Sequence, residues 1–461
     1  MSSIAQSRST KPKALRERTF LGHPLGLYVL FFTEMWERFS FYGMRVLLVL
    51  YMTDYLLKKD LQPVWGMTEL KSLLESMHGA LGIQPFSSHI YGLYTSLVYL
   101  TPVFGGLIAD RYFGQRKTVV LGGVLMAIGH FLMAFENYFL IALIFLIFGN
   151  GFFKPNLSTQ VGALYPQGDT RRDGAYTIYY MGINLGAMLA PLVCGTLGQF
   201  YGWHYGFGAA GVGMVVGLLL YMWSHNLLAP DDIHERKATA HLEKPLSKNE
   251  WRAIAGLVAL CLLNIIPWCV YEQQGNTMQI FADRNTDWHI FGYEMPSTWF
   301  QFFNPFFIFV LGPFLNMFWS WQAKHKCEQT SVIKMAIGCA LLGLGFLFLI
   351  PITSGLGDNQ RISFLWLVGA TFVYTLGELY LSPVGLSLVT KVAPARIVGM
   401  MMGIWFLSIF VGNYISGSYV GTLYESMPKN NFFLMLGVLA LLASLSIFAL
   451  NKPIRKAIGN V

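Results

Sequence analysis

The sequence has few charged residues. Asp, Glu, Lys and Arg make up only 12% of its 461 residues, against roughly 25% in a typical soluble domain. Apolar residues make up 54% of the chain. A soluble core cannot absorb this much apolar surface, but a bilayer can. The composition therefore argues against a soluble protein and favours one embedded in a membrane.

Cysteines and catalytic groupings are also scarce. None of the five cysteines falls in a predicted outer loop, so no disulfide is expected. No metal-ligand spacing, redox pair or nucleophile–base set is visible, so we expect neither a cofactor nor an enzyme. A cleavable signal is not expected either, because residues 1–22 are polar and basic and the first apolar block is long and charged.

What the chain does contain is long apolar blocks. A membrane-spanning helix needs about 20 mostly apolar residues, and the sequence predicts twelve such helices. They lie near 24–53, 86–109, 118–135, 138–160, 174–199, 204–224, 251–281, 298–322, 331–352, 362–389, 396–424 and 431–451.

The polar stretch 225–250 separates six predicted helices from six, which suggests two similar halves, as in many transporters. The fold class that we predict is an all-α membrane protein with two six-helix bundles around a central cavity. The expected boundaries are an N-terminal tail 1–23, a first bundle 24–224, a cytoplasmic linker 225–250, a second bundle 251–451 and a tail 452–461.

The net charge of +8 reflects topology. Most Lys and Arg residues fall in the segments that share a side with the N-terminus, and such an excess marks the cytoplasmic side. We therefore expect both termini in the cytoplasm and a lipid bilayer, not nucleic acid, as the partner of this basic chain. The short loops favour a bacterial inner membrane, and a monomer is expected.

Seven ionisable residues fall inside the predicted spans. A charge at the bilayer centre costs about 2.5–3.5 kcal/mol even on the most permissive scales, so these residues must form pairs or line a wet cavity. They are Glu34, Glu37, Arg38, Arg45, Lys154, Glu272 and Glu378.

The first predicted helix gathers its charges on one side. At 100° per residue, one face about 140° wide holds most of its polar groups. We interpret this face as the wall of a polar cavity; a purely structural ion-pair cluster is the alternative. The face comprises Glu34, Glu37, Arg38, Phe41, Tyr42 and Arg45.

Matching depths in the two halves predict two ion pairs between them. Arg45 and Glu272 each lie 21 residues into a helix that enters from the cytoplasm, and Lys154 and Glu378 each lie 16 residues into a helix that enters from outside. We expect Arg45–Glu272 and Lys154–Glu378 to act as gating salt bridges, the first of which closes the outer side. The set holds four carboxylates and three cations, so one added proton would neutralise it and could shift a conformational equilibrium.

On the first predicted helix, EMWERFSFYG (34–43) resembles the ExxERFxYYG motif of the proton-dependent oligopeptide transporters, within the major facilitator superfamily. Five further motifs resemble those of this family, and all six follow in the family's order. A loop at 105–117, GGLIADRYFGQRK, resembles that of the superfamily. The remaining matches are GNGFFKPNL (149–157), YYMGINLG (179–186), WCVYEQQG (268–275), FQFFNPFF (300–307) and GELYLSPVGLS (377–387).

The resemblance implies a proton-coupled symporter that imports di- and tripeptides by alternating access, with protons as the coupling ion. It assigns proton coupling to Glu34, Glu37 and Arg38. It assigns the peptide carboxylate to Arg38, Arg45, Lys154 and Tyr42, and the peptide amine to Asn184, Asn304 and Glu378. It places Phe41, Tyr94, Trp268 and Trp405 in side-chain pockets. Ordinary packing is the alternative for the two Trp, and interhelical hydrogen bonds are the alternative for the two Asn.

Two departures from the family pattern stand out. Phe41 replaces the first Tyr of the motif, and the linker 225–250 is too short for the extra helix pair of many bacterial members. The second helix also lacks the histidine of animal members, and His89, near its outer start, is expected to be solvated. The alternative function is proton-coupled transport of another small anion or zwitterion on the same fold.

Overall fold

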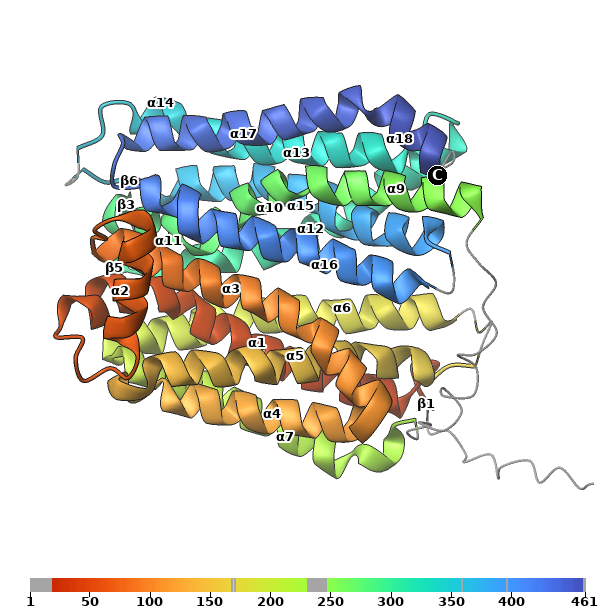
Figure 1. Ribbon diagram of the computed structural model, residues 1–461, viewed down its shortest axis with the longest axis horizontal. Coiled ribbons are helices and arrows are strands. Elements are labelled where there is room, and N and C mark those ends of the chain that lie inside the picture. The colour runs from red at the N-terminus through yellow and green to blue at the C-terminus, as the bar shows by residue number, and fades with distance from the viewer. Residues whose placement is uncertain are drawn as a thin grey trace, which may run out of the picture.

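In the part of the chain that the structure describes, twelve helical rods run side by side along the long axis of the molecule (Figure 1). A computed structural model describes residues 19–166, 169, 171–229, 247–357, 360–394 and 397–458. The first six rods are α1 (Leu25–Asp54), α3 (Ile83–Ile108) with η2 (Ala109–Phe113), α4 (Gln115–Leu132), η3 (Glu136–Tyr138) with α5 (Phe139–Ala163), α6 (Arg171–Ala190) with η4 (Pro191–Gly195) and η5 (Leu197–Tyr201), and α7 (Trp203–Trp223).

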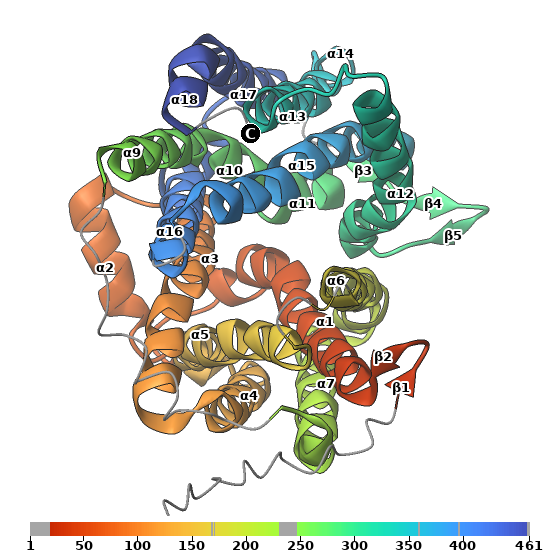
Figure 2. The same cartoon turned by 90° about the vertical axis from the view of Figure 1, so that its right-hand side faces the viewer.

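The second six rods lie in the other half of the molecule, and Figure 2 shows the two groups end-on, one above the other. They are α9 (Lys248–Leu263) with α10 (Ile265–Tyr271), η7 (Glu272–Gly275) and α11 (Thr277–Arg284); η8 (Ser297–Phe302) with α12 (Phe303–Lys324); α13 (Ser331–Leu347) with α14 (Ile350–Thr353); α15 (Phe364–Val392); α16 (Val398–Ile415) with η10 (Ser416–Val420) and η11 (Gly421–Leu423); and α17 (Lys429–Ala449).

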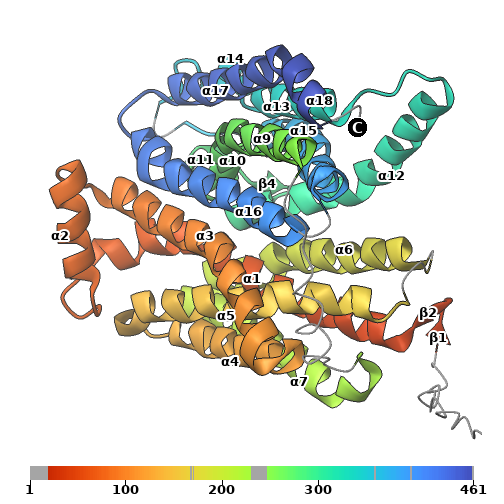
Figure 3. The ribbon, with the colours of Figure 1, turned by 45° about the vertical axis from the view of Figure 1, so that its right-hand side comes forward.

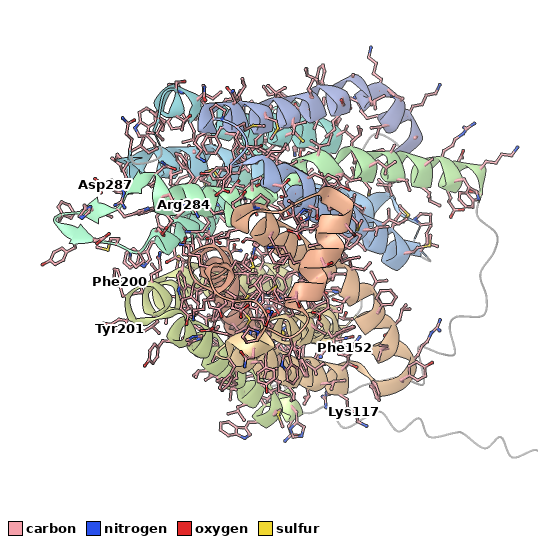
Figure 4. The ribbon with its side chains drawn as sticks, turned by 60° about the vertical axis from the view of Figure 1, so that its left-hand side comes forward. Lys117, Phe152, Phe200, Tyr201, Arg284 and Asp287 are labelled. Carbon is pink, nitrogen blue, oxygen red and sulfur yellow. The ribbon has the colours of Figure 1, made fainter. Side chains whose placement is uncertain are left out.

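Short elements cover the two ends of the molecule. At the terminal end, where the described chain begins and finishes, lie the antiparallel strands β1 (Thr19–Phe20) and β2 (His23–Pro24), η6 (His225–Leu227) and α18 (Asn451–Ile458). At the opposite end, the loop end, lie η1 (Leu56–Lys58), α2 (Met67–His78), the parallel pair β3 (Thr286–Asp287) and β6 (Ile362–Ser363), and the antiparallel pair β4 (His289–Ile290) and β5 (Tyr293–Glu294). Figure 3 shows α2 standing crosswise to the rods, and Figure 4 shows Arg284 and Asp287 at the end opposite Lys117.

Ten of the rods are long and apolar enough to cross a membrane, among the residues that the structure describes. The other two, α1 and α4, pack lengthwise against those ten: α1 against α6, and α4 against α5. The chain is therefore an integral membrane protein, and the twelve observed rods lie within a few residues of the twelve predicted spans.

The seventh rod is broken in the membrane. Asn264 ends α9, and Pro267, which has no backbone N–H, lies in the first turn of α10. The rod then narrows to the 3₁₀ turn η7 before α11 begins at Thr277. This irregular backbone carries Glu272 and Gly275, which lie against α1 and α3. Membrane proteins tolerate broken helices where other parts of the protein cover them.

Some sequence predictions need comment. Residues 1–18 of the N-terminal tail and 230–246 of the linker lie outside the described part of the chain. The prediction that His89 is solvated is wrong. Its side chain is 1% exposed, because α2 covers this end of α3 and brings the ring of His78 to 4.6 Å between centroids.

Candidate substrate-binding site

A cavity of about 410 Å³ lies between the two halves. Its volume falls in the usual range for small-molecule sites, about 300–1,000 Å³. Residues of α1, α3, α5, α6 and η4 form one wall, and residues of α10, η7, η8, α12, α15 and α16 form the other. The cavity contains six of the seven charges that the sequence places inside the membrane: Glu34, Arg38, Arg45, Lys154, Glu272 and Glu378.

The first charge cluster is built on one turn of α1. Arg38 lies four residues after Glu34, which puts both side chains on one side of the helix, and its Nε is 3.0 Å from Glu34 Oε1. The same Nε also contacts Glu37 Oε2. Neutral donors hold the other carboxylate oxygens: Tyr179 Oη donates to Glu34 Oε2 at 2.7 Å, and Asn150 Nδ2 donates to Glu37 Oε1 at 3.2 Å.

Two members of the predicted α1 face are turned away from the cavity. Glu37 is fully buried and faces Asn150 of α5, not the cavity. Phe41 stacks on Tyr94 of α3, with 6.4 Å between ring centroids, and neither ring is among the lining residues. The helical wheel places Glu37 and Phe41 on one flank of the face, and neighbouring helices cover that flank. Two predictions are therefore not met in this structure: that Glu37 and Phe41 face the cavity, and that Phe41 and Tyr94 line a side-chain pocket.

The second cluster joins the two halves. Arg45 Nη2 of α1 is 2.5 Å from Glu272 Oε2 of η7, the ion pair that their matched depths suggest. Arg45 Nε donates to Tyr91 Oη of α3 at 2.9 Å. Gly275 lies against Arg45 and Tyr91, since a Cβ there would come within 3.1 Å of both Arg45 Nη2 and Tyr91 Cζ. Glycine at this position thus lets the broken seventh rod approach α1 and α3.

The other predicted ion pair is absent. Among the described residues, no carboxylate lies within ion-pair distance of Lys154, and no cation lies within that distance of Glu378. Lys154 Nζ stands 4.8 Å from the centre of the Tyr99 ring, and Glu378 accepts a hydrogen bond of 2.7 Å from Asn304 Nδ2. Equal depth was not enough for a contact, because the two side chains line opposite walls of the cavity.

The remaining predicted residues do line the cavity: Tyr42, Asn184, Asn304, Trp268 and Trp405. Asn184 Nδ2 is held by the backbone oxygen of Tyr180 on its own helix, at 3.0 Å. Trp405 is almost fully buried and packs against Gly385, where a Cβ would come within 2.7 Å of Trp405 Cζ2. The aromatic wall therefore depends on a glycine in α15.

The sequence analysis missed four residues that hold the charges: Asn150, Tyr179, Tyr91 and Tyr99. Asn150 lies one helical turn before Lys154 in GNGFFKPNL, and Tyr179 opens YYMGINLG, so both motifs contained the signal. Tyr91 and Tyr99 are eight residues apart on α3 and therefore lie on the same side of that helix.

Comparisons with known proteins agree with this architecture. The model of the POT family matches residues 116–242 and 231–435. This chain belongs to the POT family. It is 33% identical over 97% of its length, and 98% of the relative's, to the uncharacterized transporter YclF of Bacillus subtilis. It is 31% identical to the peptide transporter YePEPT of Yersinia enterocolitica, over 96% of this chain and 97% of that one.

Solved structures of the POT family share the fold. A POT family transporter in complex with 5-aminolevulinic acid superposes with a TM-score of 0.81 at 29% identity, over 95% of this chain and 98% of that one. The protein is thus a membrane transporter of the POT family and not an enzyme.

Proposed function

We propose that this POT family member imports di- and tripeptides by alternating access, with protons as the coupling ion. The observation that carries the proposal is that Lys154 and Glu378 line one cavity with no ionic partner among the described residues. A zwitterionic peptide supplies a carboxylate for the first and an amine for the second, and buried charges are stable only when they are paired.

The donors around the two charges suit this role. Asn304 lies beside Glu378 and can share an amine with it, and Asn184 lines the cavity from α6. Trp268 and Trp405 offer apolar surface to peptide side chains. The relative YePEPT is a peptide transporter, and the relative solved with 5-aminolevulinic acid holds a small molecule that also carries an amine and a carboxylate.

Alternating access is supported by contacts that join the halves at the loop end. Ser88 Oγ of α3 donates to Asn276 Oδ1 at 3.1 Å, and Gln84 Nε2 donates to the backbone oxygen of Gly421 at 2.9 Å. Beside them α3 and η10 cross so closely that a Cβ on Gly92 would come within 2.7 Å of Gly417 Cα. If the terminal end lies in the cytoplasm of a bacterial cell, as the basic residues suggest, these contacts would close the outer side. The transporter would then act as a monomer.

Proton coupling would rest on Glu34, Glu37 and Arg38. Two carboxylates share one guanidinium in this cluster, so the cluster carries one excess negative charge until a proton binds. Neutralising it would release Arg38 from one of its partners and change the charge that the cavity presents to a peptide. Binding of a proton that favours one conformation over the other would shift the equilibrium between them.

The direct test is uptake of labelled dialanine into proteoliposomes whose outer solution is more acidic than the inner one. We expect accumulation that collapses when the pH gradient is dissipated with a protonophore. Uptake that is the same with and without the gradient would contradict proton coupling, and absence of any uptake would contradict peptide transport.

Closing of the loop end should depend on the close approach of Gly92 on α3 to Gly417 on η10. We expect Gly92→Leu to oppose the closed state, because overpacking costs about 1–3 kcal/mol, a shift of roughly 5- to 150-fold in the balance of conformations. Gly106→Leu on the same helix is the matched control, since no atom lies within 4 Å of its Cβ position. Dialanine uptake should fall for the first variant only; equal uptake in both would argue against this closure.

The aromatic wall can be tested through its supporting glycine. Gly385→Val should displace the Trp405 ring and raise the KM for dialanine by about tenfold, the effect of losing roughly 1.4 kcal/mol. Gly403→Val on α16, which has open space at its Cβ position, serves as the control. An unchanged KM in Gly385→Val would contradict the proposal that Trp405 contributes to peptide binding.

The alternative, transport of another small anion or zwitterion, uses the same two charges. The relative bound to 5-aminolevulinic acid favours including this compound as a candidate. Competition decides between them: unlabelled dialanine and 5-aminolevulinic acid are compared as inhibitors of uptake of either label. Stronger inhibition by dialanine supports the peptide, and the reverse order supports the alternative.

A further inference from the structure

The charges that line the cavity balance one another. Three are carboxylates and three are cations, and the other lining residues are neutral. Four of the six are already committed in pairs. Glu34 and Arg38 lie 3.0 Å apart, and Arg45 and Glu272 lie 2.5 Å apart.

These pairs are not easily opened to a ligand. Glu34 and Glu272 are 1% and 2% exposed, and each pair has further support, from Tyr179 on Glu34 and from Tyr91 on Arg45. Taking one partner from a buried ion pair leaves an uncompensated charge, which is strongly unfavourable. Lys154 and Glu378 are therefore the two lining charges available to a substrate.

Both available charges are used by the termini of a peptide, if the proposed function holds. The walls beside them then decide which side chains fit. Along α15, Ser382 and Leu386 follow Glu378 at steps of one helical turn, and Ile308 follows Asn304 by one turn on α12; all three line the cavity. Next to Lys154 on α5, the lining residues are Pro155 and Ser158. These walls contain no charge.

We propose that this transporter selects peptides whose side chains are uncharged. This inference rests on the proposed function and narrows its substrate class. A Lys, Arg, Asp or Glu side chain on the peptide would bring a charge into the cavity that meets neither an opposite charge nor a free ion-pair partner. Such a charge costs far more free energy on leaving water than a neutral side chain of the same size does.

Matched peptides measure the charge alone. Unlabelled peptides are compared as inhibitors of the uptake of labelled dialanine into proteoliposomes. At the first position, Lys-Ala is compared with norleucyl-alanine, and Asp-Ala with Asn-Ala. At the second position, Ala-Lys is compared with Ala-norleucine, and Ala-Asp with Ala-Asn. We expect the concentration that gives half inhibition to be at least about tenfold higher for each charged peptide than for its neutral counterpart. Half-inhibition concentrations of charged and neutral peptides that lie within threefold of one another would overturn the proposal.

A variant locates the selectivity in the wall. Leu386→Glu adds a carboxylate one turn beyond Ser382. It should strengthen inhibition by Lys-Ala relative to inhibition by norleucyl-alanine by about tenfold. Leu386→Gln should leave this ratio of inhibition unchanged. Equal ratios in the two variants would place the discrimination elsewhere and contradict the assigned wall. Failure of wild-type protein to transport dialanine at all would instead contradict the proposed function, so the two failures are distinguishable.

Discussion

Replacing Lys154 with glutamine is expected to abolish dialanine uptake at ordinary substrate concentrations. Lys154 is the one cation of the cavity lining without a carboxylate at ion-pair distance in the described part of the chain, so the peptide carboxylate would lose its counter-charge. Losing one partner of a buried, hydrogen-bonded charge pair costs about 2–5 kcal/mol. That corresponds to roughly 30-fold to several thousand-fold in affinity.

The measurement is the concentration dependence of dialanine uptake in proteoliposomes. Lys452→Gln is the control, because Lys452 is exposed on α18, far from the cavity. Glu378→Gln should be impaired to a similar degree through the peptide amine. If Lys154→Gln transports dialanine with an affinity within threefold of wild type, Lys154 does not hold the carboxylate.

A charge swap of Arg45 and Glu272 should restore part of the activity that each single reversal removes. Arg45→Glu alone places two carboxylates together, and Glu272→Arg alone places two guanidinium groups together. The site is buried, since the Glu272 side chain is only 2% exposed. Breaking a buried pair costs about 3–5 kcal/mol. We therefore expect near-complete loss of uptake in either single variant.

Restoration by the double variant should be partial. The swap re-forms the ion pair between α1 and η7 but loses the hydrogen bond from Arg45 Nε to Tyr91 Oη. Initial rates of dialanine uptake, corrected for the amount of protein reconstituted, give the comparison. A double variant as inactive as both single variants would mean that the pair does not close the loop end.

The sequence predicted the helices well, because a membrane span is a local property. An apolar block of sufficient length is enough to define each rod, and the observed rods lie close to the predicted spans. The charges inside the spans were equally informative, since a bilayer offers them no alternative to a pair or a cavity. Six of the seven accordingly line one cavity.

What the sequence could not predict is which neighbour each side chain faces. The helical wheel correctly grouped Glu34, Arg38, Tyr42 and Arg45 on the cavity side of α1, but it carries no information on the helix that covers Glu37. Depth was sufficient for Arg45 and Glu272 because their helices meet at the loop end. It was not sufficient for the second predicted pair, where the cavity separates the two helices.

The most direct test of the account is the position of a bound peptide. A structure of this protein in lipid with dialanine should show the peptide carboxylate within hydrogen-bond distance of Lys154 Nζ and the amine beside Glu378 and Asn304. The pairs Arg38–Glu34 and Arg45–Glu272 should stay intact, because Lys154 and Glu378 meet the two charges of the peptide. A peptide that contacts neither Lys154 nor Glu378 would contradict the claim that these two unpaired charges bind the substrate.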